Sequence, residues 1–264
     1  MKTSDPAQQS MLPSARAREA LGVMLNILGP TLAKGVIIRR PTVVALAERL
    51  DLDRQSVHMQ QLRRRHGDGP LLIGPVWGRR WALVLAPEHV RRVLDGTPEP
   101  FATDSSEKRA ASHFQPKGVL ISHGVERADR RRFNEDVLET DRPAHRLAEK
   151  FLATVDEEAR QLLVGIRQRG ELEWDRFAFT WFRVVRRVVF GDAARDDHEI
   201  TDLIARLRSY ANWAFLRRKR PSVRDRFLQR VGDHLARAEP GSLASVMVTV
   251  PATSQTAPSH QVPQ

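Results

Sequence analysis

The chain has 264 residues, enough for one large domain or two small ones, and 41% of them are hydrophobic, so most of it is expected to fold. Its formal net charge is +11, but the 43 basic residues, mostly arginine, are interspersed with 32 acidic ones, which favours salt-bridged surfaces over a nucleic-acid role. There is no cysteine, which excludes disulfides, cysteine-ligated zinc, iron–sulfur clusters and a cysteine nucleophile or haem ligand within this sequence.

Residues 1–29 are interpreted as a flexible N-terminal lead. A short amphipathic helix is predicted from about residue 20, broken at Gly29-Pro30. No signal peptide is visible, and the apolar run at 21–28 is too short to span a bilayer. We therefore expect a cytoplasmic protein with no membrane span.

Helical periodicity appears over residues 42–66 in two pieces that are joined by Asp51-Leu52-Asp53. Two apolar runs then flank a turn at Gly78-Arg79, which predicts a β-hairpin near residues 70–86. Both strands are apolar on both faces, so we expect the hairpin to pack on each side. Pro87 opens a further short helix.

Helical patterns dominate the remainder of the chain, over 122–138, 142–168, 175–190, 197–213 and 221–238. Phe177, Trp181 and Val185 share one stripe, so the helix over 175–190 is predicted to be buried. Residues 240–264 contain no Asp, Glu, Lys or Arg and are predicted to form a polar Pro/Ser/Thr-rich tail, as a loop or disordered. The predicted fold is mainly α (α+β), with one helical domain over 30–239 between lead and tail.

The stretch ISHGVERADRRRF, residues 121–133, places six charges in the seven positions 126–132. On a helix, Arg127 and Arg131 lie four residues apart on one face, where they could hold a dianion through charge-assisted, bidentate contacts. A nucleic-acid backbone and a solvated salt-bridge face are the alternatives, and spacing alone favours the salt-bridge face.

Residues 45–57, ALAERLDLDRQSV, are similar to a helix-turn-helix, with Ala47 at the tight helix contact and Val57 packing back from the second helix. The turn position that prefers glycine in such motifs is Asp51, which weakens the match. The polar side chains that would line the recognition helix are Arg54, Gln55, His58 and Gln61. An ordinary helical pair in a larger core remains the favoured alternative.

Sequence motifs of other enzyme classes are absent. No Gly-x-Ser-x-Gly, Walker A or Gly-x-Gly-x-x-Gly sequence occurs. The nine histidines never fall three or four residues apart, so no helical His pair for a metal exists. These absences disfavour hydrolase and nucleotide-enzyme functions.

The order of segments resembles the N-terminal half of a cytochrome P450, a haem-thiolate monooxygenase, over about residues 30–264. The resemblance lies in RRRHGDGPLLI before the hairpin, APEHVRRVLDG and PFATDS after it, and GVLISHGVERADRRRFNEDVL. It implies that His123-Gly124 occupies the small-residue pair before the family's C helix. It also implies that Arg127 and Arg131 match the two positions that contact the haem propionates, although Arg127 stands where the family has His or Trp.

In this family the intact enzyme binds haem, takes electrons from a ferredoxin or flavin reductase, and inserts one oxygen atom into a small apolar substrate. The resemblance implies that residues 101–118 form the loop over the substrate and that 197–238 form two helices that cover the pocket. The sequence stops where the family's central helix begins, and its oxygen-handling acid–alcohol pair and cysteine loop are missing. We therefore expect a truncated or split member, inactive alone, with no catalytic or metal-ligating residue of its own.

A missing central helix would leave much of the apolar surface of 142–190 uncovered and the chain poorly stable. Two other functions remain open. One is a basic helix-turn-helix DNA-binding protein that uses residues 45–66. The other is a non-catalytic interaction protein whose helical core descends from the enzyme family.

Overall fold

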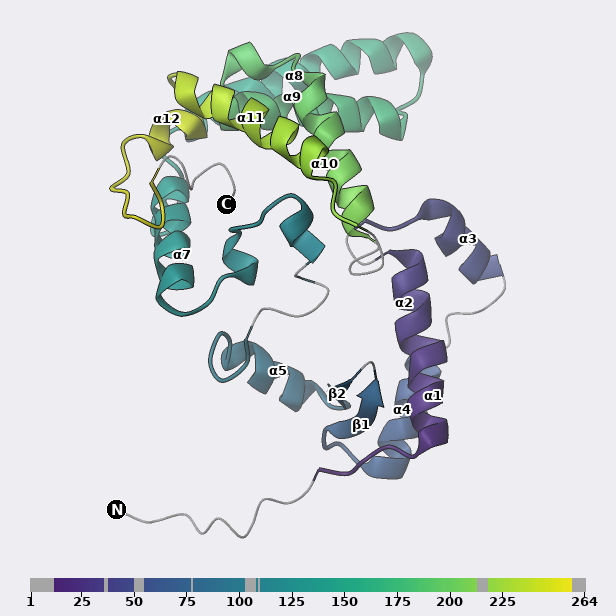
Figure 1. Ribbon diagram of the computed structural model, residues 1–264. Helices are drawn as coiled ribbons and strands as arrows, with labels where there is room; N and C mark the ends of the chain where they lie inside the picture. Colours follow the sequence, from purple (N-terminus) through teal and green to yellow (C-terminus); the bar gives the residue numbers. More distant parts are fainter. Residues whose placement is uncertain are drawn as a thin grey trace. The chain divides into compact units, whose positions relative to one another are not determined.

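The structure is a computed structural model that describes residues 12–35, 38–49, 55–76, 78–102, 108, 110–212 and 218–257. It is mainly helical with one two-stranded antiparallel sheet, which confirms the predicted mainly α class with one small hairpin (Figure 1). The chain divides into two compact units, Met1–Thr103 and Asp104–Gln264, where the sequence predicted one domain over 30–239. No described helix has the length and apolarity that a bilayer-spanning segment needs.

In the part of the first unit that the structure describes there are five α-helices, a π-helical turn and the hairpin. In chain order these are α1 (Ala17–Val23), η2 (Met24–Leu28), α2 (Gly29–Lys34), α3 (Pro41–Arg49), α4 (Gln55–His66), β1 (Leu71–Val76), β2 (Arg79–Leu83) and α5 (Pro87–Asp95). The described part of the predicted flexible lead is therefore largely helical, and the predicted break at Gly29-Pro30 is wrong. The reason is the π-helical turn, in which the Gly29 N–H reaches back to the Met24 carbonyl, so that the helix continues past a proline that has no N–H to donate.

The hairpin pairs Leu71 with Leu83 and Ile73 with Trp81, with an irregularity between Ile73 and Val76. Gly78 in the turn has a φ of +74°, which favours glycine. Leu71 and Ile73 are buried, but on the opposite face Leu72 is half-buried and its partner Ala82 is exposed. The expectation of packing on both faces is therefore wrong.

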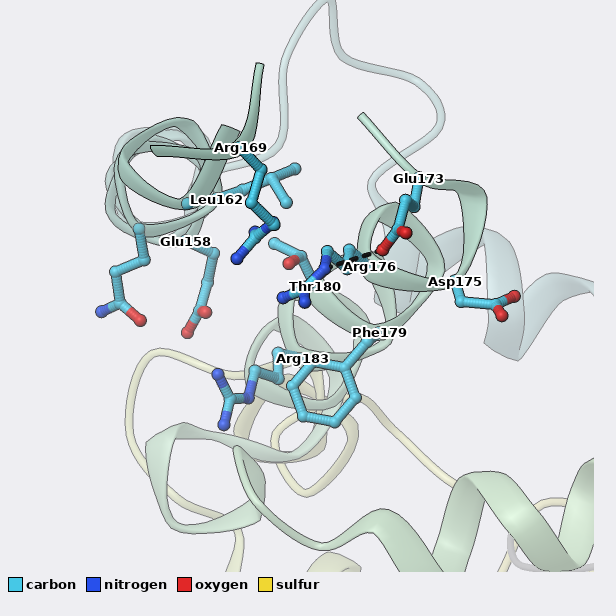
Figure 2. Close-up of a pocket in the computed structure, with 11 residues that line it drawn as sticks. Glu158, Leu162, Arg169, Glu173, Asp175, Arg176, Phe179, Thr180 and Arg183 are labelled. Carbon is cyan, nitrogen blue, oxygen red and sulfur yellow. Dashed lines mark hydrogen bonds and ion pairs between the residues drawn. The ribbon is translucent and has the colours of Figure 1, made fainter. Parts of the chain in front are cut away.

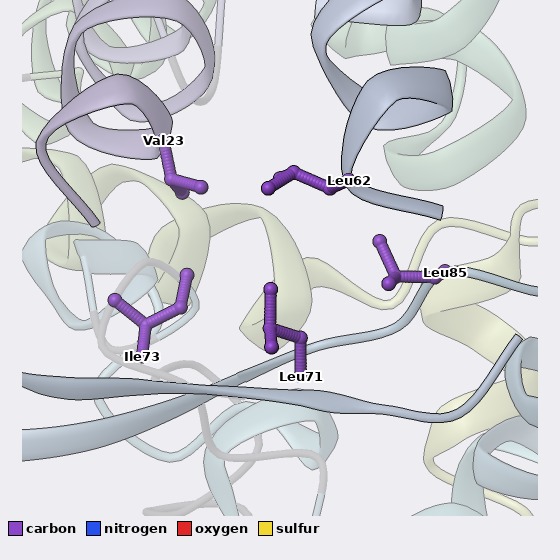
Figure 3. Packing of buried hydrophobic residues seen from close by; sticks show 5 residues of the cluster. All are labelled: Val23, Leu62, Leu71, Ile73 and Leu85. Atoms are coloured by element: carbon purple, nitrogen blue, oxygen red, sulfur yellow. The ribbon is translucent and has the colours of Figure 1, made fainter. Parts of the chain in front are cut away.

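The core of the first unit lies between this buried face of the hairpin and helices α1 and α4 (Figure 3). Its five buried side chains are Val23, Leu62, Leu71, Ile73 and Leu85. Glu19 on α1 adds a polar tie, because its carboxylate lies 3.1 Å from the His66 imidazole at the end of α4. Apolar burial and this tie together hold α1 and α4 against the sheet.

Among its described residues, the second unit has six bounded α-helices and three 3₁₀ turns. These are η3 (Ala110–His113), η4 (Val119–Ile121), α7 (Gly124–Leu138), α8 (Ala148–Arg169), α9 (Trp174–Phe190), η5 (Asp192–Ala194), α10 (His198–Ala211), α11 (Pro221–Arg237) and α12 (Leu243–Met247). Helices α7 to α11 confirm the five predicted helical segments. Gly170, with a φ of +81°, ends α8 in the left-handed conformation expected of a C-terminal glycine.

The start of the predicted polar tail packs onto α7. Val246 of α12 is buried against Phe133 and Val137. Further along, the Thr253 hydroxyl donates to Asp129, and Arg132 donates to the Pro251 carbonyl at 3.2 Å. The prediction of a loop or disordered tail is wrong at α12, where a helix places Val246 in a core, whereas residues 248–257 form the predicted loop and bond to partners on α7.

Helix α9 is less buried than its apolar stripe predicted. Val184 is buried, but Phe177 is 38% exposed, Trp181 53% and Trp174 73%. On α8, Leu152 is 67% exposed. These exposures agree with the expectation that much of the apolar surface of 142–190 is left uncovered. The buried side chains of α9 are Val184, Arg186 and Arg187, and Arg187 donates to Glu158 of α8.

Candidate functional site

The arginine-dense stretch forms the first turns of α7. The chain leaves η4, passes the buried Ser122 and enters the helix at Gly124, whose φ of +50° favours glycine. The Ser122 hydroxyl donates to the Gly118 carbonyl at 2.8 Å, which fixes its position beneath the helix. This entry places a hydroxyl oxygen where a side chain from the second turn of α7 can reach it.

Arg130 is the buried arginine of the stretch, with a side chain only 3% exposed. Its Nη1 donates to the Ser122 Oγ at 2.5 Å, and it forms an ion pair with Glu126 one turn earlier. Its Nε is buried and has no acceptor. Arg130 was not singled out in the sequence analysis. The signal was present, because Arg130 shares the face of Phe133 and Val137, which lie in the core.

Arg127 lies three residues before Arg130 and is half-buried. Its Nε is also buried without an acceptor, and within the described part of the chain its guanidinium has no ion-pair partner. A buried donor without an acceptor costs about 1–3 kcal/mol, and more when it is charged. An external anion that reached either Nε would satisfy a donor that has no acceptor.

Arg131 lies in a different environment. Its side chain is 56% exposed, and its Nε donates to Glu135 at 2.6 Å. An exposed pair of this kind contributes about 0–1 kcal/mol and exchanges readily with solvent. The structure therefore does not bring Arg127 and Arg131 together as two equivalent free donors: Arg127 lacks a partner, and Arg131 already has one.

The remaining charges of the stretch form a surface network. Arg132 pairs with Asp129 at 3.0 Å and with Asp136 at 2.7 Å. The hydrogen bond from Thr253, together with Arg132, lowers the pKa of Asp129 below its ordinary value. The solvated salt-bridge face thus accounts for Arg131 and Arg132, while Arg127 and Arg130 retain the donors that an anion would need.

The predicted helix-turn-helix finds little support in the first unit. Its turn, residues 50–54, lies outside the described residues, as does the side chain of Gln55. Ala47 is buried, but Val57 is 53% exposed and so does not pack back onto the first helix as expected. His58 faces α1, where a side chain on Gly22 would lie 2.7 Å from its ring. Of the four predicted recognition residues, Gln61 is exposed.

A buried ionic network links α8, α9 and η5, which sequence reasoning did not predict. Glu158, 1% exposed, accepts from Arg187 at 2.9 Å and from Arg195 at 2.5 Å. Burial alone would raise the pKa of Glu158, but these two guanidinium groups outweigh it and hold the pKa below its usual range. Arg187 also pairs with Glu157 and Asp192. Every charge in this network has a partner, so its role is structural.

No three His, Asp or Glu side chains gather as a metal site would require in the portion of the chain that the structure describes. Comparison of the chain with protein-family models, with curated proteins and with solved structures finds no match.

Proposed function

We propose that this chain supplies the cofactor-clamping and pocket-covering half of a haem-thiolate monooxygenase and has no monooxygenase activity by itself. The observation that carries the proposal is the Arg127 guanidinium, whose buried Nε has no acceptor at the position that the resemblance aligns with a propionate contact. The order of sequence segments around it is the second support.

The haem propionates are two carboxylates at one edge of a planar cofactor, and they would satisfy the donors of α7. Arg127 would contact one of them directly. Arg131 would contact the other after releasing Glu135, an exchange that costs little because the pair is exposed. Haem with a thiolate ligand supplies oxygen activation, and no cysteine of this sequence can supply that ligand. The chain's own part is therefore to bind and orient the cofactor.

The uncovered apolar surface of α8 and α9 also supports the proposal. Large side chains such as Trp174 and Leu152 stay exposed on these two helices. A surface of this kind is typical of a fold that a further segment or chain completes. The small apolar substrate, the ferredoxin or flavin reductase partner and the cytoplasmic location stay predictions.

The test is an absorption titration of the purified chain with haem, repeated after reduction under carbon monoxide. We expect a shifted Soret band that is lost or weakened in Arg127→Gln, while Arg160→Gln, an exposed arginine of α8, leaves it unchanged. No Soret shift, or an equal shift in Arg127→Gln, would contradict the clamp. Hydroxylation of any substrate by this chain with haem and a reductase would contradict the predicted inactivity.

The exposed aromatic side chains of α9 favour a second candidate, a non-catalytic interaction protein with the same helical core. Such a protein would fold without haem, which circular dichroism and a melting curve would show. DNA binding through residues 45–66 is less favoured, because His58 and Val57 are not placed as a recognition helix needs. A mobility shift with steep salt dependence, lost in Arg54→Ala, would restore it.

A further inference from the structure

A pocket of about 590 Å³ opens between the C-terminal half of α8 and the N-terminal half of α9 (Figure 2). Its volume falls within the range of about 300–1,000 Å³ typical of small-molecule sites. Leu162 of α8 and Phe179 of α9 supply its apolar lining, and three arginines, Arg169, Arg176 and Arg183, line it from the two helices. An apolar floor with convergent cations is suited to a ligand that is both apolar and anionic.

Arg183 is held by two contacts. Its guanidinium lies 4.5 Å from the centre of the Phe179 ring, and its Nη2 donates to Asp196 at 2.8 Å. Its Nε is buried and has no acceptor. The stacked ring and the ion pair hold the guanidinium in place, so this unsatisfied donor is positioned before any ligand arrives.

Arg169 reaches into the pocket across Gly165. A Cβ at position 165 would lie 2.5 Å from the Arg169 Nη2, so the close approach depends on glycine at that position. No residue in the described ranges accepts a hydrogen bond from the Arg169 side chain. Figure 2 shows Arg169 and Arg176 extending from their helices into the gap between them. Like charges converge here at an electrostatic cost that a bound anion would relieve.

The carboxylates near the pocket are largely engaged elsewhere. Glu158 is held by Arg187 and Arg195, and Glu173 pairs with Arg176 at 2.9 Å. They partly neutralise their own partners and leave two donors without an acceptor, the exposed Arg169 guanidinium and the buried Arg183 Nε. Asp175, at the pocket edge, is exposed to solvent, where its charge is screened.

We propose that this pocket binds a small aromatic carboxylate. Arg169 and the Arg183 Nε hold the carboxylate oxygens, and the ring packs against Phe179 and Leu162. The site uses no residue of α7 and no haem, so it stands independently of the function proposed above.

The test is a ¹⁹F NMR titration of the full chain with 4-fluorobenzoate, with the neutral 4-fluorobenzamide as the charge control. We expect saturable binding of the benzoate, and binding of the amide that is at least about tenfold weaker, because a charge-assisted contact to guanidinium is lost. Arg169→Gln should weaken benzoate binding about tenfold, since this exposed side chain can be replaced without disturbing the fold. Arg183→Gln should weaken it to a similar or greater degree.

The matched control is Arg167→Gln, which removes an exposed cation from the same last turn of α8 outside the pocket. It should leave benzoate affinity unchanged. Equal weakening in Arg167→Gln and Arg169→Gln would show nonspecific charge attraction and overturn the proposal. Loss of binding in Trp181→Gln with full binding in Arg169→Gln would place the probe on the exposed apolar stripe and overturn it too. The proposal would also be overturned if 4-fluorobenzamide bound as tightly as 4-fluorobenzoate, or if benzoate binding did not saturate.

Discussion

Glu158 and Arg187 form an ion pair that is almost completely removed from solvent, with Oε1 2.9 Å from Nη1 and side chains 1% and 7% exposed. The pair joins α8 to α9, and the same carboxylate accepts from Arg195 just after η5. Buried charges are tolerated when each is paired and hydrogen-bonded, a condition that holds throughout this cluster. The cluster therefore holds together two helices that both expose apolar side chains to solvent.

Removal of the shared carboxylate should destabilise the second unit strongly. Glu158→Ala leaves Arg195 without its main acceptor and Arg187 with two partners, and we expect a loss of about 3 kcal/mol in the free energy of unfolding. Urea denaturation followed by circular dichroism measures it. Glu149→Ala, at an exposed glutamate in the first turn of the same helix, should change stability by less than about 0.5 kcal/mol. Equal effects of the two changes would show that the cluster contributes nothing specific.

Acid should weaken the contact that Asp197, the residue just before α10, makes with α11. Burial raises the pKa of Asp197, but hydrogen bonds from Arg230 at 2.9 Å and His234 at 2.7 Å outweigh burial and lower it. A carboxylate with a lowered pKa in the fold stabilises fully above its unfolded value of about 3.9 and loses that contribution as pH falls through the folded value.

Asp197→Asn should therefore lower stability at pH 7 by about 1–3 kcal/mol, and its difference from the parent chain should shrink below about pH 4. Urea midpoints between pH 3 and pH 7 test this. Asp225→Asn, at an exposed aspartate of α11, is the control and should show no such convergence. A difference that stays constant across the range would mean that the Asp197 charge is not what holds the contact.

Arg127 is predicted to trade stability for ligand binding. Its buried Nε lacks an acceptor, so Arg127→Met should raise the free energy of unfolding by about 1 kcal/mol in the absence of any anion while abolishing the haem-induced Soret shift. Arg131→Met removes an exposed pair and should change stability by less than about 0.5 kcal/mol. Loss of stability in Arg127→Met would show that the guanidinium already has a partner.

The exposed aromatic side chains of α9, Trp174, Phe177 and Trp181, should drive self-association or dye binding without contributing to the free energy of unfolding. Trp181→Gln, at a side chain 53% exposed, should reduce binding of a hydrophobic fluorescent dye and change stability by less than about 0.5 kcal/mol. Phe133→Ala, at a side chain 0% exposed, should cost about 3–5 kcal/mol. Sedimentation measures the self-association, and urea denaturation measures the stability. A loss of stability in Trp181→Gln would mean that this side chain is packed in solution.

Much of the secondary structure could be predicted from the sequence, because the spacing of apolar residues and the glycines at helix ends and turns are local features. The apolar spacing within α8 and the glycine at 170 predicted both the helix and its end. The turn at Gly78 predicted the hairpin. The errors occurred where a local rule was outweighed, as at Pro30, where a π-helical turn carries the helix through, and at α12, where Val246 found a core to enter.

The sequence located the candidate site at one arginine-rich turn of α7 but did not predict the environment of each arginine. Spacing identified Arg127 and Arg131 but not which arginine turns inward. Phe133 and Val137 set that rotation by burying their own face, and Arg130 goes with them. Arg131, about 100° further round the helix, is left in solvent.

By itself, the sequence determined the order and type of most elements, the absence of any cysteine to ligate iron, and the position of the arginine-dense turn. The tertiary structure decided which of those arginines lacks a partner, which helix faces stay uncovered, and that Glu158 meets Arg187 and Arg195 from 29 and 37 positions away. The reason is the distance along the chain over which each effect acts. Periodicity acts over one or two turns, whereas ion pairing and burial depend on which distant surfaces the folded chain brings together.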